Sequence, residues 1–434
     1  MPRFSRRGRH ASAVLAPALA LGWLAGACAP GTGAAPTPAL PAPAAPELPA
    51  VSVEQSPGPD PCAFEPSGPL RADTVRVIAG SAFPARQLYQ TLIRLDCTGR
   101  PRSGLATGWS PADAGRTWVL TLGDARFWDG AAVTAETVAT GWAHDSASTA
   151  ALREAGILFV GASGDRELRI LLAAPSDSVP AALADQRLSV MRRTPDSPWP
   201  VGTGAYRLPE SDPAPATLEP VGNGRPLRLL ARPRDLRDAV DAGVDIVVTD
   251  DPATLAYVAG RAGFMSLPLP WTRAYGLVLT SANDSSAADV TPAFKETLAR
   301  DAVRIDARAA TAVAAGCPVA TLAPNRSAHP GTRIAYRAGD RTAGDLAARL
   351  AALGIAGARS VVALDSVALI ASLRAGAEVA YVVVLARACD EASRAAGAAV
   401  LPLVETRAHA VVRSGAPPLT VDRDGVLRLL PETP

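Results

Sequence analysis

Short strand-like runs alternate with helical patterns along most of this chain, and this alternation constrains its fold most strongly. The runs are rich in Val, Ile and Leu and are bounded by Gly, Pro or Asp, as strands are. Thr134 is a good N-cap for a helix through Trp142, and Asp345 to Leu353 form a second helical pattern with Gly354 at a C-cap position. The mixture predicts an α/β fold. Strands are expected at 74–79, 117–122, 167–172, 227–231, 245–248, 275–280, 360–364 and 379–385.

The N-terminus has the features of an export signal. Arginines within the first nine residues precede an uncharged apolar stretch from Ala11 to Leu24. That stretch is shorter than the roughly 20 apolar residues of a transmembrane helix. The small residues Ala25 to Ala27 then precede Cys28, as in a bacterial lipobox. We expect residues 1–27 to be removed and Cys28 to carry a lipid. Ordinary cleavage is the alternative, because Ala25 stands where a lipobox usually has leucine.

Residues 28–69 have a different composition from the rest of the chain. Ala, Pro, Gly and Thr dominate, and large apolar side chains are almost absent. Such a segment cannot bury enough surface to fold, and its prolines favour extended conformations. We therefore expect a semi-rigid tether between the membrane and the folded part.

The rest of the chain is long enough for two or more lobes. The whole sequence is 48% hydrophobic and carries a formal net charge of +2, which argues against disorder and against charge-driven nucleic-acid binding. No second segment is apolar and long enough to predict a membrane span.

The reactive side chains do not form a catalytic or metal-binding pattern. There is no GxSxG motif and no CxxC motif, so we expect neither an enzyme nor a metal site or cofactor. An even number of cysteines remains after Cys28 in an exported chain, which makes disulfides plausible. The histidines are scattered at positions 10, 144, 329 and 409.

Several motifs then follow one another in an order that resembles one family. Leu88–Asp96 and Gly104–Trp109 are similar to its YEGL and GLAESW segments, and Thr117–Val138 to its strand, KFHDG-like turn and TAEDV helix start. Val201–Tyr206 follows its VGTGPY. Weaker matches lie at 242–246 and 294–308. The family is family 5 of the bacterial extracellular solute-binding proteins, which bind peptides or nickel complexes for ABC importers. The resemblance covers Leu70 to the end.

The resemblance implies a two-lobed periplasmic-binding-protein type II fold with mixed sheets and a hinge between the lobes. Lobe I would comprise residues 70–225 and 398–434, and lobe II residues 226–397. Four cysteines allow three pairings. We favour Cys62 with Cys97 and Cys317 with Cys389, because each pair then lies within one lobe.

In this family the ligand lies between the lobes. Trp271, Arg273 and Tyr275 are the best candidates, since aromatic faces and a forked guanidinium suit a peptide-like or carboxylated ligand. Packing within a half-buried strand is the alternative for these residues. The full set of expected ligand residues is Tyr89, Gln90, Thr203, Tyr206, Asp250, Trp271, Arg273 and Tyr275.

The resemblance also implies a function and partners. We expect a monomeric, lipid-anchored receptor on the periplasmic side of the cell envelope that delivers a short peptide or similar zwitterion to an ABC permease in the inner membrane. The aromatic and Asp-Pro-rich segment of peptide binders is missing around residues 380–390, which suggests a trimmed lobe II. The alternative is therefore a non-transport envelope lipoprotein that uses the same fold for signalling or protein interaction.

Overall fold

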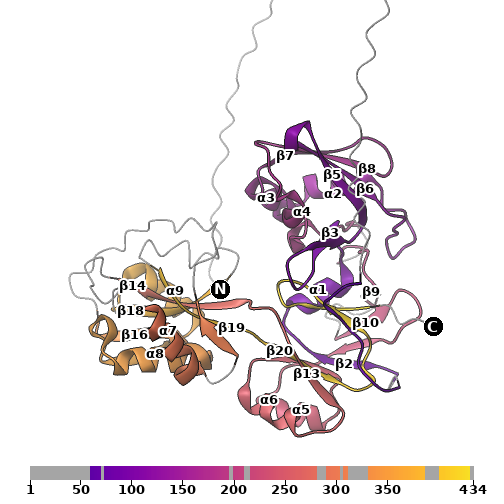
Figure 1. The fold of residues 1–434 in the computed structure, drawn as a ribbon. Helices are drawn as coiled ribbons and strands as arrows, with labels where there is room; N and C mark the ends of the chain where they lie inside the picture. Colours follow the sequence, from indigo (N-terminus) through magenta and orange to yellow (C-terminus); the bar gives the residue numbers. More distant parts are fainter. Residues whose placement is uncertain are drawn as a thin grey trace, which may run out of the picture. The chain divides into compact units, whose positions relative to one another are not determined.

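The computed structural model describes residues 59–69, 73–194, 199–209, 216–280, 290–303, 306–310, 331–386 and 400–430. Parallel and antiparallel strand pairs occur within these ranges, with helices packed on the sheets (Figure 1). The predicted α/β class with mixed sheets is therefore confirmed. No helix in the described ranges is long and apolar enough to cross a membrane.

A seven-stranded sheet is built around β2, which is paired in parallel with β11 and β12. Its two faces carry different cores because successive side chains of a strand point to opposite sides. Val75 and Val77 face α1 (Ala82–Leu88), and Ile78 faces α5 (Leu236–Asp241) and α6 (Pro252–Ala259). The strand order is β13 (Phe264–Pro268), β20 (His409–Arg413), β12 (Ile246–Thr249), β2 (Val75–Ile78), β11 (Leu227–Leu229), β10 (Thr217–Pro220) and β9 (Tyr206–Arg207).

A four-stranded antiparallel sheet lies between β4 and β9 in the sequence. Its order is β5 (Ala106–Ala112), β6 (Thr117–Leu122), β8 (Glu167–Leu172) and β7 (Ile157–Ala162). Helices α2 (Ala135–His144) and α3 (Ser146–Glu154) pack on it through buried residues that include Trp142. Thr134 caps α2 as predicted, since its hydroxyl accepts from the Thr137 amide at 3.2 Å while Thr137 Oγ1 accepts from the Thr134 amide at 2.9 Å.

The third main sheet of the described residues has six strands. Tyr275 and Leu277 of β14 face α8 (Arg341–Ala352), and Val278 faces the side on which α9 (Ser366–Ala375) packs. Helix α8 begins before the predicted Asp345, because the Asp340 carboxylate accepts from the Ala343 amide at 2.9 Å and caps it there. The order is β15 (Ala307–Ala309), β19 (Val400–Thr406), β14 (Arg273–Leu279), β18 (Ala380–Ala386), β16 (Arg333–Arg337) and β17 (Ser360–Leu364).

Smaller elements complete the described ranges. A three-stranded sheet contains β1 (Ala63–Phe64), β21 (Leu419–Val421) and β22 (Leu427–Leu429), and β3 (Ile93–Leu95) pairs with β4 (Pro101–Ser103). The short helical segments are α4 (Val179–Ala182), α7 (Pro292–Leu298), η1 (Asp113–Gly115), η2 (Gln186–Leu188), η4 (Ala299–Val303) and η5 (Ile355–Gly357).

The sheets correct the predicted lobe boundaries. Strands β11, β12 and β13 pair within the sheet of β2, whereas the resemblance places residues 226–397 in lobe II. Strand β19 pairs with β14, whereas the resemblance places residues 398–434 in lobe I. The chain passes between the two sheets at 269–272 and at 407–408. Local patterns predict these strands but carry no information on which distant strand pairs with them.

The predicted tether also ends too late. Residues 59–69 belong to the folded part: Cys62 is buried, and β1 pairs with β21 through Ala63 and Thr420. Composition predicted an unfolded segment because Pro and Gly are frequent up to residue 69. Long-range pairing outweighs that local preference.

Candidate functional site

Two of the predicted ligand residues, Gln90 and Thr203, contact each other in the structure. The backbone N–H of Gln90 donates to Thr203 Oγ1 at 3.3 Å, and that hydroxyl donates to the Val190 carbonyl at 3.4 Å. Gln90 also bridges to Val190, whose amide donates to the Gln90 carbonyl at 2.8 Å. The end of α1 is thereby joined to residues about a hundred positions later in the sequence, at Val190 and Thr203.

Tyr89 lies beside this junction at the end of α1. Its ring centroid is 5.8 Å from that of Trp128, and its hydroxyl donates to the Pro200 carbonyl at 3.4 Å. Burial raises the pKa of Tyr89 despite the nearby charge of Arg193. Tyr206 is buried in the core of the seven-stranded sheet, so packing accounts for its position.

The glycines of the 201–206 motif permit a close backbone approach. A Cβ atom at Gly202 would lie 2.3 Å from the Leu88 carbonyl oxygen, and one at Gly204 would lie 2.0 Å from that of Gln87. Any other residue would force the segment away from α1. The motif therefore determines where Thr203 lies.

Asp250, Arg273 and Tyr275 form a second group. The Arg273 guanidinium pairs with the Asp250 carboxylate, and these side chains are 48% and 31% exposed. Tyr275 is buried, and its hydroxyl donates to Asp340 Oδ1 at 3.3 Å. Burial and the Asp340 charge raise the pKa of Tyr275. Burial alone would lower the pKa of Arg273. The charge of Asp250 and the other acidic neighbours outweighs burial, so the pKa of Arg273 is raised.

Trp271 packs against arginines that sequence reasoning did not select. The guanidinium carbons of Arg308 and Arg407 lie 4.5 and 4.8 Å from its ring centroid. Arg407 Nε donates to Asp306 Oδ2 at 2.7 Å, and Arg308 Nε donates to Glu405 at 2.6 Å. These residues come from separate parts of the sequence, so no local signal could have grouped them.

His409 connects Asp306 to Ser266, also unforeseen from the sequence. Its Nε2 lies 3.1 Å from Asp306 Oδ2, and its Nδ1 lies 3.0 Å from Ser266 Oγ. Nucleophilic catalysis uses these residue types. Here Arg407 donates to the same Asp306 oxygen that His409 contacts. Ser266 lies in the middle of β13, which pairs with β20, and not at a turn beside oxyanion donors. The arrangement is that of a polar packing cluster.

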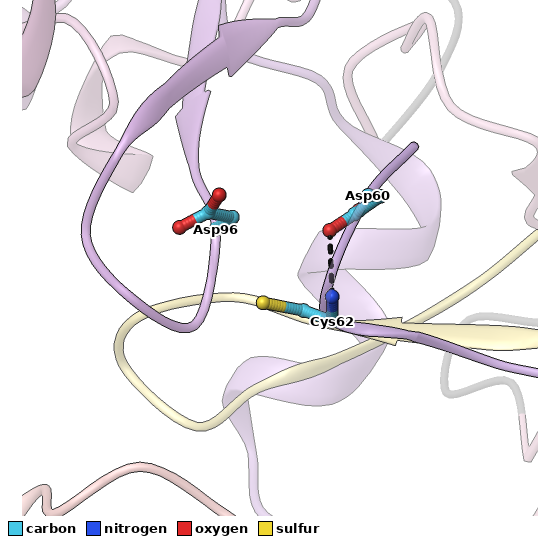
Figure 2. Close-up of side chains that lie close together, drawn as sticks. All are labelled: Asp60, Cys62 and Asp96. Carbon is cyan, nitrogen blue, oxygen red and sulfur yellow. Dashed lines mark hydrogen bonds between the residues drawn. The ribbon is translucent and has the colours of Figure 1, made fainter. Parts of the chain in front are cut away.

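Figure 2 shows Asp60, Cys62 and Asp96, whose potential ligand atoms lie within 4.8 Å of one another. Their chemistry does not fit a metal ion. Cys62 is disulfide-bonded to Cys97, with the Cα atoms 5.7 Å apart, so its sulfur is not a thiolate. This is the pairing favoured from the sequence. Cys28, Cys317 and Cys389 lie outside the described residues.

The two carboxylates of this group are already hydrogen-bonded. Asp60 accepts from Thr420 Oγ1 at 2.8 Å and pairs with Arg94. Asp96 accepts from Arg102 Nε at 2.9 Å and from the Arg100 amide at 3.0 Å. Burial alone would raise the pKa of each, but the hydrogen bonds outweigh burial and lower both. These contacts connect residues 60–62 to residues 94–97 and to Thr420, so the role of the group is structural.

Comparison with known proteins finds one matching family model in the middle of the chain. Residues 100–221 match the family model described as bacterial extracellular solute-binding proteins, family 5 Middle. Over these residues the chain is similar to this family. The match includes the four-stranded sheet and the motifs at 104–109, 117–138 and 201–206. None of the curated protein sequences compared with the chain matches it.

Several solved structures share the fold of this chain. NikZ from Campylobacter jejuni in complex with Ni(L-His) is 13% identical, with a TM-score of 0.60 over 82% of this chain and 98% of that chain. AgaA from A. tumefaciens R10 in complex with agropinic acid is 12% identical, with a TM-score of 0.57 over 83% and 99%. The murein tripeptide binding protein MppA of Escherichia coli is 14% identical, with a TM-score of 0.54 over 78% and 94%. At these identities the likeness concerns the fold.

Proposed function

We propose that this protein is the lipid-anchored substrate-binding component of an ABC importer. The family 5 match at residues 100–221 carries the proposal, because proteins of this family bind peptides, nickel complexes or other ligands for ABC import. The charged start, the apolar run and Cys28 support export and anchoring on the periplasmic side of the cell envelope. The partners are then an ABC permease in the inner membrane and a small ligand, bound by a monomer between its lobes.

A short peptide or similar zwitterion is the ligand that we propose. Arg273 and Asp250 are both partly exposed and form an ion pair. A zwitterion could present its carboxylate to the guanidinium and its ammonium group to the carboxylate, so that neither charge loses a partner. Tyr89, Gln90, Thr203, Trp271 and Tyr275 complete the proposed set of ligand residues, and Tyr206 supports them from the core.

A thermal-shift screen of peptides, amino acids, nickel chelates and sugars tests the ligand class. A ligand at a hundredfold excess over its Kd should stabilise the protein by about 2.7 kcal/mol. Arg273→Ala should then weaken peptide binding roughly ten- to hundredfold, the loss of a charge-assisted hydrogen bond. Arg261→Ala is the matched control, because Arg261 also pairs with an aspartate, Asp241, and its side chain is 41% exposed.

Two results would contradict this assignment. An unchanged peptide affinity in Arg273→Ala would remove Arg273 from the site. If no compound class shifts the melting temperature at millimolar concentration, the protein is not a receptor for these ligands. The alternative, a non-transport envelope lipoprotein that acts in signalling or protein interaction, would then take the place of this proposal.

Replacement of Cys28 by Ser tests the anchor separately. Without the acylated sulfur the protein should leave the membrane fraction, because no helix of the described residues is long and apolar enough to hold it in the membrane. Cell fractionation followed by immunoblotting measures this, and an unchanged membrane-bound pool would contradict lipidation.

A further inference from the structure

The indole N–H of Trp142 has no hydrogen-bond acceptor in the part of the chain that the structure describes. Trp142 lies on α2 and is only 2% exposed. A buried N–H group without an acceptor is costly, and buried tryptophans usually find one. The group therefore needs an explanation.

A small pocket lies beside Trp142. It is lined by Gly141 of α2, by Asp145 and Ser148 at the start of α3, and by the segment 189–191. Other polar groups of the lining already have partners. Ser148 Oγ donates to the Arg187 carbonyl at 2.7 Å, and Ser189 Oγ donates to the Gln186 carbonyl at 2.7 Å. The unmatched group is a donor, so the occupant must offer an acceptor.

Because Gly141 has no side chain, the Met191 carbonyl lies close to α2 beside the same pocket. A Cβ atom at this position would lie 3.4 Å from the Met191 carbonyl oxygen. An occupant that also donates could therefore bridge α2 and the segment 189–191. Water accepts and donates, and it suits a small pocket with a few polar partners.

We propose that this pocket binds one structural water, which accepts from Trp142 Nε1 and donates to the Met191 carbonyl. The neighbouring Val190 bonds to Gln90 and Thr203, so the water holds the backbone beneath these two proposed ligand residues. Its role is to position that backbone. The water site itself does not depend on the proposed function.

NMR of the full chain with ¹⁵N-labelled tryptophan tests the site. The Trp142 indole N–H should show a cross-peak to a long-lived water and slow exchange with solvent. Trp142→Phe assigns the signal among the seven tryptophans. Gly141→Ala adds a methyl group to the pocket and should abolish the water cross-peak. Gly222→Ala is the control and should leave it unchanged, because nothing lies within 4 Å of a Cβ atom there.

Two outcomes would overturn the proposal. One is a wild-type indole signal without a water cross-peak, and the other is a cross-peak that persists in Gly141→Ala. If Trp142→Phe does not fold, a crystal structure replaces the assignment. It should show a water within about 3.2 Å of both Trp142 Nε1 and the Met191 oxygen. An organic solute there, or a dry pocket, would refute the water site.

Discussion

At the scale of single residues, Asp96 shows how a buried charge is stabilised. Its exposed fraction is 0%, and its carboxylate accepts hydrogen bonds from Thr98, Arg100 and Arg102. A buried carboxylate without such partners would be protonated or would destabilise the fold. Here the partners hold it in the charged form, which makes stability depend on pH.

We expect Asp96→Asn to destabilise the protein by about 2 kcal/mol at pH 7, because an amide cannot replace the carboxylate as an acceptor for the guanidinium of Arg102. The pKa of Asp96 in the folded state lies below its ordinary value of 3.8, so its contribution is present above pH 3.8 and is lost as the pH falls further. Urea unfolding of both proteins at pH 7 and below pH 3.8 measures this.

The matched control for Asp96 is Asp124→Asn. Asp124 pairs with Arg166, but the two side chains are 73% and 57% exposed. Such a pair contributes at most about 1 kcal/mol, so this substitution should change stability little. Equal effects of the two substitutions would contradict the importance given to burial.

At the scale of elements, the contact between α1 and the 201–206 segment depends on glycine. Gly204→Ala would place a Cβ atom 2.0 Å from the backbone oxygen of Gln87, which cannot move without disturbing α1. We expect a loss of about 3 kcal/mol in unfolding free energy, the upper end for an overpacked site. Thr203 would also move away from Gln90.

Chemical denaturation of Gly204→Ala beside Gly222→Ala measures this effect. Gly222 has nothing within 4 Å of an added Cβ atom, so its substitution should change stability by less than about 0.5 kcal/mol. A Gly204→Ala protein as stable as the wild type would show that the close approach is not required.

At the scale of the whole molecule, residues 59–69 connect early and late parts of the chain. Cys62 is bonded to Cys97, Asp60 accepts from Thr420, and β1 pairs with β21. A chain truncated to 59–434 should therefore keep the stability of the full folded part. Truncation to 70–434, with Cys97 replaced by Ser, should lower the free energy of unfolding by about 2–4 kcal/mol through loss of the disulfide. Arg94 would also lose its partner Asp60, which lowers the stability further.

Thermal melting of the two truncated chains distinguishes a structural role from a tether. The double replacement of Cys62 and Cys97 by Ser in the 59–434 chain should fall between them, since it removes only the disulfide. If the shorter chain melts at the same temperature as the longer one, residues 59–69 act as part of the tether after all.

The sequence by itself determined the local elements and the resemblance to one family. The bounds predicted for β6, β8 and β17 agree with the structure, and Thr134 caps α2 as expected. These features depend on alternation, capping and turn residues within a few positions of one another, so a single sequence contains the necessary information. The motifs of residues 104–206 are likewise local, and the family model matches mainly there.

Only the tertiary structure decided which distant segments meet. It placed β11 beside β2 and β19 beside β14, brought Arg308 and Arg407 to Trp271, and included Cys62 in the folded part. Strand periodicity determines which face of a strand is buried but does not select the partner strand. That selection depends on the packing of the whole chain, because each pairing competes with every other way of burying the same apolar surface.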